Sequence, residues 1–228
     1  MNQTGPRPLA TGLRPNVKGN LLNTLFALKN NGLEESSLKS ISDKLRHIGR
    51  YTDLNNPEAV KEFIANKNGK RSYKHSLVKA YDYYVKANDL QWKKPKYHPK
   101  KGLPRPPTTE QVKQLIAGAS KKYAPIFKFM SETGASPIEV SIMNESSFDF
   151  ERNTVYIEGR KGHADRIVPI KTELSALMKL YFVKYDTFPR NVIISGKFRK
   201  YRDLLSTKLK NKSLRNIRLY DLRHYFGI

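Results

Sequence analysis

The sequence predicts a protein of the α+β fold class, mainly α-helical with a small β-hairpin or sheet. It also predicts that the chain forms two domains. Apolar residues recur at three- and four-residue steps through residues 20–92, the spacing of helices that bury one face. Residues 93–107 are basic and rich in proline and show no apolar period, as in an extended linker. Residues 154–157 and 166–170 alternate like the two strands of a hairpin.

These patterns set the expected boundaries. Residues 1–18 contain several prolines and glycines without periodicity and are expected to form a flexible basic arm. A helical domain is expected at 19–92, the basic linker at 93–107 and a second domain at 108–228.

The helical domain is expected to contain four short helices. Asn56-Pro57-Glu58 predicts a helix start, with an N-cap, a proline at the first helical position and an acid in the first turn. Tyr81 belongs to an apolar stripe and is expected in the core. Other tyrosines of this region could instead stack on bases.

The second domain is expected to begin with two helices. Thr108 and Gln111 predict a capping box, and a second apolar helix should cover about 123–131. The predicted hairpin comes next. Two further helices are expected, one through 174–182 and one from 198 to 210.

The charge of the chain points to a polyanionic partner. The sequence has 228 residues, with 43 Lys and Arg against 20 Asp and Glu, for a formal net charge of +23. Such a surplus repels itself in the folded state. Nucleic acid is the first candidate, because neutralised phosphates release counterions and so supply affinity. A solvated basic surface, as in some ribosomal proteins, is the alternative.

Other classes are disfavoured by composition. The chain has no cysteine, and its five histidines lack the spacing of metal ligands, so we expect no metal and no small-molecule cofactor. No apolar run approaches the roughly 18 residues of a membrane span. We therefore expect no membrane partner and a cytoplasmic, nucleoid-associated protein.

Three stretches carry the candidate chemistry: TGASPIEV at 133–140, GRKGHADRIVPI at 159–170 and LYDLRHYF at 219–226. Breaking a phosphodiester without metal requires fixed cations for the non-bridging oxygens, a nucleophile, a base and an acid for the leaving oxygen. Arginine suits the clamp because its planar fork stays charged and can bind two oxygens.

In this order and spacing the three stretches resemble the tyrosine recombinase (phage integrase) family, in a form common among archaeal integrases. The resemblance covers the chain from about residue 20 to its end. It implies a SAM-like helical core-binding domain, a DNA breaking-rejoining catalytic domain, double-stranded DNA as partner and a tetrameric synapse on DNA. It implies DNA integration by a site-specific recombinase of an archaeal or viral mobile element, with strand cleavage and rejoining through a 3′-phosphotyrosine.

The first stretch resembles the family motif T-G-x-R-x-x-E but has Ser136 where the family has its first clamp arginine. A short neutral hydroxyl cannot neutralise a phosphate, and losing such a contact typically costs on the order of 10²–10³ in rate. Glu139 is expected to be structural and to anchor the helix. We do not expect Arg160 or Arg166 to replace the missing arginine.

The second stretch resembles the hairpin motif of the family, which implies that Lys161 is the acid for the leaving oxygen. The alternative is an ordinary basic hairpin. The third stretch implies that Arg223 is the second clamp arginine. Tyr220 stands where the family has histidine, and a phenol is a poor base near neutrality. His224 follows the arginine and is expected to be mainly structural.

In the family, the nucleophilic tyrosine lies several dozen residues beyond the third stretch. We therefore expect a C-terminally incomplete catalytic domain, from a truncated gene or one part of a split protein, that is inactive in strand cleavage. The alternative function is a non-enzymatic DNA-binding accessory or regulatory module derived from an integrase. An RNA-binding protein is a third possibility, which only the charge supports.

Basic residues in both domains are expected to contact DNA. They are Lys70, Arg71, Lys74, Lys93, Lys94, Lys96, Lys100, Lys101, Arg160, Arg166, Lys197, Arg199, Lys200 and Arg202.

Overall fold

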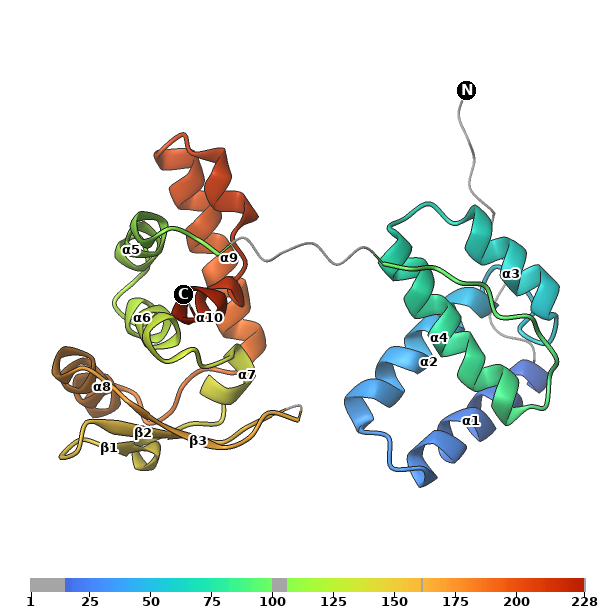
Figure 1. Ribbon diagram of the computed structural model, residues 1–228, viewed down its shortest axis with the longest axis horizontal. Helices are drawn as coiled ribbons and strands as arrows, with labels where there is room; N and C mark the ends of the chain where they lie inside the picture. The colour runs from blue at the N-terminus through green and yellow to red at the C-terminus, as the bar shows by residue number, and fades with distance from the viewer. Residues whose placement is uncertain (1–14, 100–105, 161, 228) are drawn as a thin grey trace. The chain divides into compact units, whose positions relative to one another are not determined.

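The computed structural model describes residues 15–99, 106–160 and 162–227 (Figure 1). The described residues fall into two compact units, 15–99 and 106–227. Most of the chain is helical and the single sheet is small and antiparallel, so the predicted class is confirmed. Residues 1–14 of the expected arm, together with Lys100, Lys101 and Lys161, lie outside the described residues.

The first unit is built from four helices, which are α1 (Pro15–Asn30), α2 (Glu35–Gly49), α3 (Pro57–Asn66) and α4 (Arg71–Ala87). Helices α1, α2 and α4 pack on one another, and α3 packs on α4. Their shared core is apolar, and Leu45, Ile48, Ile64 and Leu77 are fully buried.

Helix α1 begins at Pro15, inside the segment expected to be an arm, so the expected boundary at residue 18 is wrong. The reason is packing: Leu21 and Leu28 are buried in the core of this unit, and Pro is well tolerated in a first helical turn. Only the first turn of α1, residues 15–18, falls within the expected arm; the rest lies in the region expected to be helical.

The predicted start of α3 is confirmed. The side chain of Asn56 accepts a hydrogen bond from the backbone N–H of Ala59 at 3.1 Å, and Pro57 opens the helix. Tyr81 is fully buried, as predicted, and its hydroxyl donates to the carbonyl oxygen of Leu54 at 2.8 Å.

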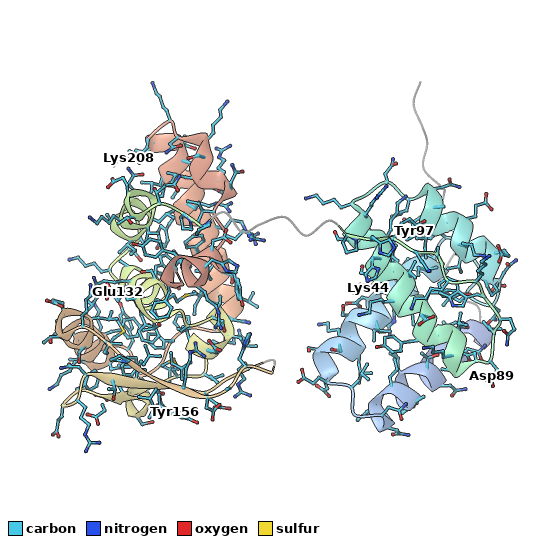
Figure 2. The ribbon with its side chains drawn as sticks, viewed as in Figure 1. Lys44, Asp89, Tyr97, Glu132, Tyr156 and Lys208 are labelled. Carbon is cyan, nitrogen blue, oxygen red and sulfur yellow. The ribbon has the colours of Figure 1, made fainter. Side chains whose placement is uncertain are left out.

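The chain after α4 folds back onto this unit. The Trp92 ring meets Tyr81 edge-on with centroids 4.8 Å apart, and Trp92 Nε1 donates to Asp82. Lys94 forms an ion pair with Asp82 at 2.9 Å. Tyr97 packs against the core, and Figure 2 shows it beside α4. Residues 92–97 are therefore held against helix α4, although they contain no helix or strand.

The second unit has six α-helices among its described residues: α5 (Thr109–Ala117), α6 (Ala124–Thr133), α7 (Pro137–Val140), α8 (Thr172–Lys184), α9 (Asn191–Lys208) and α10 (Asp221–Phe226). The 3-10 helices are η1 (Glu145–Ser147) and η2 (Lys212–Asn216). Helix α6 is central, since α5, α8 and α10 all contact it (Figure 1). The predicted Thr108–Gln111 capping box is confirmed.

The sheet has the order β1-β2-β3, with β1 (Phe148–Asp149), β2 (Thr154–Ile157) and β3 (Arg166–Pro169). Strands β2 and β3 form the predicted hairpin, in which Ile157 pairs with Arg166. Val155 and Ile157 are buried, whereas Tyr156 is exposed on the opposite face (Figure 2). This alternation follows from the two-residue period of a strand with one buried face.

Two features of this unit differ from the expectation. Helix α9 begins at Asn191 and ends at Lys208, not from 198 to 210. Its first turns carry the exposed Val192 and Ile193 beside the buried Ile194, so they do not show a clean apolar period. Strand β1 was not predicted, because two residues are too few to show a pattern.

No helix in the described part of the chain is both long enough and apolar enough to cross a membrane.

Candidate active site

The first motif forms a tight connection between α6 and α7. Gly134 ends α6 in the left-handed conformation, with φ of 64°, which side chains rarely adopt. A Cβ at this position would also lie 2.6 Å from the ring of Phe226. Thr133 Oγ1 accepts from the N–H of Ala135 and donates to the carbonyl oxygen of Phe129. The Thr-Gly pair therefore fixes the direction in which the chain enters α7.

Ser136 is the N-cap of α7. Its Oγ accepts from the N–H of Glu139 at 3.4 Å, and Glu139 Oε2 accepts from the N–H of Ser136 at 2.7 Å. This capping box confirms that Glu139 anchors the helix. Ser136 is only 5% exposed, so its hydroxyl serves the backbone.

Glu139 also binds two arginines from distant parts of the chain. Arg166 on β3 donates from both terminal nitrogens, at 3.1 Å to Oε1 and 3.0 Å to Oε2. Arg223 on α10 donates to the same Oε2 at 3.2 Å. Three elements, α7, β3 and α10, therefore meet at one carboxylate, and we call Glu139, Arg166 and Arg223 the arginine cluster.

The arginine cluster is cationic and partly open to solvent. The Glu139 side chain is 0% exposed, whereas those of Arg166 and Arg223 are 28% and 23% exposed. Burial alone would raise the pKa of Glu139, but hydrogen bonds from Arg166 and from the Ser136 backbone outweigh it and hold the pKa below its usual value. Glu139 is thus an anion that neutralises only one of two cations.

Arg223 is positioned by the start of α10. Asp221, which is buried, accepts from the backbone N–H of Arg218 at 2.8 Å and pairs with its guanidinium. The hydrogen bond and charge of Asp221 raise the pKa of Arg218. Leu222 is fully buried, and α10 packs on α6. These contacts fix the helix that carries Arg223.

Tyr220 and His224 lie on the same helix start as Arg223. The rings of Tyr220 and His224 meet edge-on with centroids 5.2 Å apart. Tyr220 is 39% exposed. The structure thus places Tyr220 at the surface, one residue before the buried Asp221.

The loop between β2 and β3 is organised by Asp165. It accepts a hydrogen bond from the Tyr156 hydroxyl and another from the N–H of Gly159, at 2.8 Å for the latter. These two bonds lower the pKa of Asp165. Gly159 has no room for a side chain, because a Cβ there would lie 1.9 Å from the carbonyl oxygen of His163. This loop contains the expected acid Lys161, which is not among the described residues.

The structure describes all of the basic residues expected to contact DNA except Lys100 and Lys101, and those it describes divide into two groups. Those that are exposed and have no ion pair with a described residue are Lys70, Arg71, Lys93, Lys96, Arg199 and Lys200. The others make contacts within the chain. Lys74 donates to the Ala65 carbonyl, Lys94 pairs with Asp82, Arg160 pairs with Glu158, Arg166 binds Glu139, Lys197 lies over the Tyr123 ring and Arg202 donates to the Ile217 carbonyl.

Sequence reasoning did not find that Arg166 shares Glu139 with Arg223. One signal was available: Glu139 lies in an apolar stretch between Ile138 and Val140, and a carboxylate buried there needs a cation. Its partners are 27 and 84 positions away, beyond the reach of a local pattern.

Known structures of two integrases share this fold. The structure titled as a lambda integrase tetramer bound to a Holliday junction matches with a TM-score of 0.72 and 11% identity, covering 92% of this chain and 69% of that one. The Tn1549 transposon integrase in complex with transposon right end DNA matches with a TM-score of 0.64 and 15% identity, covering 91% and 84%. The fold is that of the DNA integrases.

Sequence relatives agree with the fold. Tyrosine recombinase XerA of Thermococcus onnurineus (strain NA1) is 31% identical over 111 residues, which are 47% of this chain and 39% of the relative. Tyrosine recombinase XerA of Thermococcus kodakarensis (strain ATCC BAA-918 / JCM 12380 / KOD1) is 26% identical over 189 residues, 77% and 66% respectively. This chain thus spans less than two thirds of either relative. No protein-family model matches the chain. In sequence this chain is thus similar to tyrosine recombinases, and in fold it is similar to integrases.

Proposed function

We propose that this chain binds double-stranded DNA as a tyrosine-recombinase-type protein and holds a backbone phosphate at the arginine cluster. The observation that supports this most directly is the meeting of Arg166 and Arg223 at Glu139, within an integrase fold. Two partly exposed arginine side chains are suited to a phosphate, because each guanidinium can bind oxygens through a planar fork. The net charge of +23 supplies the long-range attraction.

Catalysis by this chain is proposed to be impaired. Ser136 replaces the first arginine and its hydroxyl is occupied as a helix cap. Tyr220 offers a phenol where a base is needed. Lys161 remains the proposed acid and His224 a structural neighbour of Arg223. In this proposal the complete reaction would be strand cleavage through a 3′-phosphotyrosine, with several copies assembled on DNA in the cytoplasm.

DNA binding is tested by fluorescence anisotropy with a labelled duplex at increasing salt. The expected result is an affinity that falls linearly on a log–log plot, with a slope of about −0.9 for each phosphate neutralised. A structured RNA of equal charge should bind more weakly. Equal or tighter binding of the RNA would contradict the proposal.

Charge removal on α9 makes the test residue-specific. The double variant Arg199→Gln with Lys200→Gln is expected to flatten the salt slope by up to about 2. Lys179→Gln with Lys184→Gln is the matched control, because these exposed lysines lie on α8, on another side of α6 (Figure 1). An equal effect of both pairs would show binding by diffuse charge alone.

The alternative function is a non-enzymatic DNA-binding module derived from an integrase, which the occupied Ser136 favours. A nicked duplex that traps covalent intermediates distinguishes a strand-transferring recombinase from a non-enzymatic module. A 3′-phosphotyrosyl adduct would establish strand transfer, whereas tight binding without an adduct supports the module.

A further inference from the structure

We infer that Arg166 supplies the second guanidinium of the phosphate clamp, the charge that Ser136 does not provide. The inference rests on the proposed function and names the residue that completes the site. It departs from the expectation that no hairpin arginine takes this part.

The guanidiniums of Arg166 and Arg223 lie close to each other. A terminal nitrogen of Arg166 and one of Arg223 each lie within 3.2 Å of a single oxygen, Glu139 Oε2. The two guanidiniums are therefore neighbours, and one anion of the size of a phosphate can contact both. Each also keeps most of its N–H donors without a partner among residues 15–99, 106–160 and 162–227.

The carboxylate and the two arginines of the cluster differ in their exposure to solvent. Glu139 is completely buried, while both arginine side chains reach solvent. The carboxylate therefore holds the two guanidiniums from the buried side, and the arginine side chains are the part of the cluster that solvent reaches. Because one anion faces two cations, the cluster keeps a net positive charge that an incoming phosphate can neutralise.

Neither Ser136 nor Arg160 places a cation beside Arg223. Ser136 is capped into α7 and is 5% exposed. Arg160, the other hairpin arginine of the motif, pairs instead with Glu158 at 3.1 Å, and among the described residues it forms no ion pair with Glu139. Of these three residues, only Arg166 places a cation beside Arg223.

A purely structural role is the competing explanation, since Arg166 also ties β3 to α7. The two roles differ in what they predict for the folded protein. A structural arginine affects the free energy of unfolding but not the affinity of the folded protein for phosphate. A clamp arginine affects that affinity directly.

The experiment uses inorganic phosphate as the probe, titrated at constant ionic strength and followed by NMR of the arginine Nε–Hε signals. In the unmodified chain, the signals of Arg166 and Arg223 are expected to shift together with one dissociation constant. Arg166→Gln should weaken phosphate binding roughly tenfold, the usual size of one lost charge-assisted hydrogen bond. Arg152→Gln is the matched control, because Arg152 also pairs with a nearby carboxylate, that of Asp149, on the β1–β2 turn. It should leave the dissociation constant unchanged.

The inference is overturned if only the Arg223 signal moves, if neither moves, or if Arg166→Gln binds phosphate as the unmodified chain does. If Arg166→Gln does not fold, the phosphate titration of the unmodified chain is enough to decide, because it shows whether the Arg166 signal moves. Duplex binding by the same samples separates the two proposals: retained DNA binding with an unmoved Arg166 signal removes this inference and the part of Arg166 in the phosphate site, but leaves the proposed binding of double-stranded DNA. Loss of DNA binding in the unmodified chain removes both.

Discussion

Arg223 on α10 donates a hydrogen bond to Oε2 of Glu139 on α7, a 3.2 Å contact between residues 84 positions apart. Arg166 on β3 reaches the same oxygen from a third element. One buried carboxylate therefore connects helix α10, the hairpin and the short helix α7.

Replacing Glu139 by glutamine should lower the free energy of unfolding by roughly 2–3 kcal/mol at pH 7, because two charge-assisted contacts lose their anion. The folded-state pKa of Glu139 is lowered, so its contribution is present above the unfolded-state pKa and disappears as pH falls through the folded-state value. Urea unfolding at pH 7 and at pH 3 measures this.

The difference between Glu139→Gln and the unmodified chain should therefore shrink in acid. Glu132→Gln is the control, since Glu132 makes a partly exposed pair with Lys128 and should cost much less. A difference of the same size at both pH values would show that the charge of Glu139 is not what stabilises the site.

Gly134→Ala should destabilise the chain by about 2–3 kcal/mol. Alanine is disfavoured at a φ of 64°, and its Cβ would press on Phe226, which belongs to the helix that carries Arg223. Gly196→Ala is the matched control, because Gly196 lies within helix α9 with no atom in the way. That change should stabilise by up to about 1 kcal/mol. Thermal unfolding of both variants checks the sign of each effect.

Asp82→Ala should release the segment that follows α4. Asp82 accepts from Trp92 Nε1 and pairs with Lys94, so its loss removes both polar ties and leaves only ring contacts. Trp92 is the only tryptophan in the sequence, and its emission should shift to the red with greater quenching by acrylamide. Asp43→Ala on the exposed face of α2 should leave the spectrum unchanged. An unshifted spectrum for Asp82→Ala would mean that Tyr81 alone holds the indole.

Tyr81→Phe should cost about 1–2 kcal/mol of stability, because the buried Leu54 carbonyl loses its donor. Burial, with the nearby Tyr84 and Asp53, raises the pKa of Tyr81, so the hydroxyl keeps its proton and the cost should not change between pH 6 and pH 9. Tyr73→Phe, at a 38% exposed position, should lie within roughly 0.5 kcal/mol of the unmodified chain. Chemical denaturation at several pH values provides the comparison.

Local signals in the sequence predicted local structure well. The caps at Asn56 and Thr108 are confirmed, because each needs only residues three positions away. The hairpin is confirmed for the same kind of reason. The first turn of α1 was missed because it follows a proline- and glycine-rich stretch, and the first turns of α9 were missed because they carry exposed apolar residues.

The site was predictable only in part. Resemblance pointed to Ser136 and Arg223, and the structure places both at the ends of helices that meet at Glu139. The contact of Arg166 with that carboxylate requires three separate elements to pack, and no local pattern contains that information. The assignment of Lys161 stays a prediction.

The local structure at position 136 is suited to serine and not to arginine. An arginine there would forfeit the serine cap of α7, at about 1 kcal/mol. It would also bring a third guanidinium toward a carboxylate that already serves two. An arginine introduced at position 136 would therefore weaken the start of the helix whose Glu139 holds both Arg166 and Arg223.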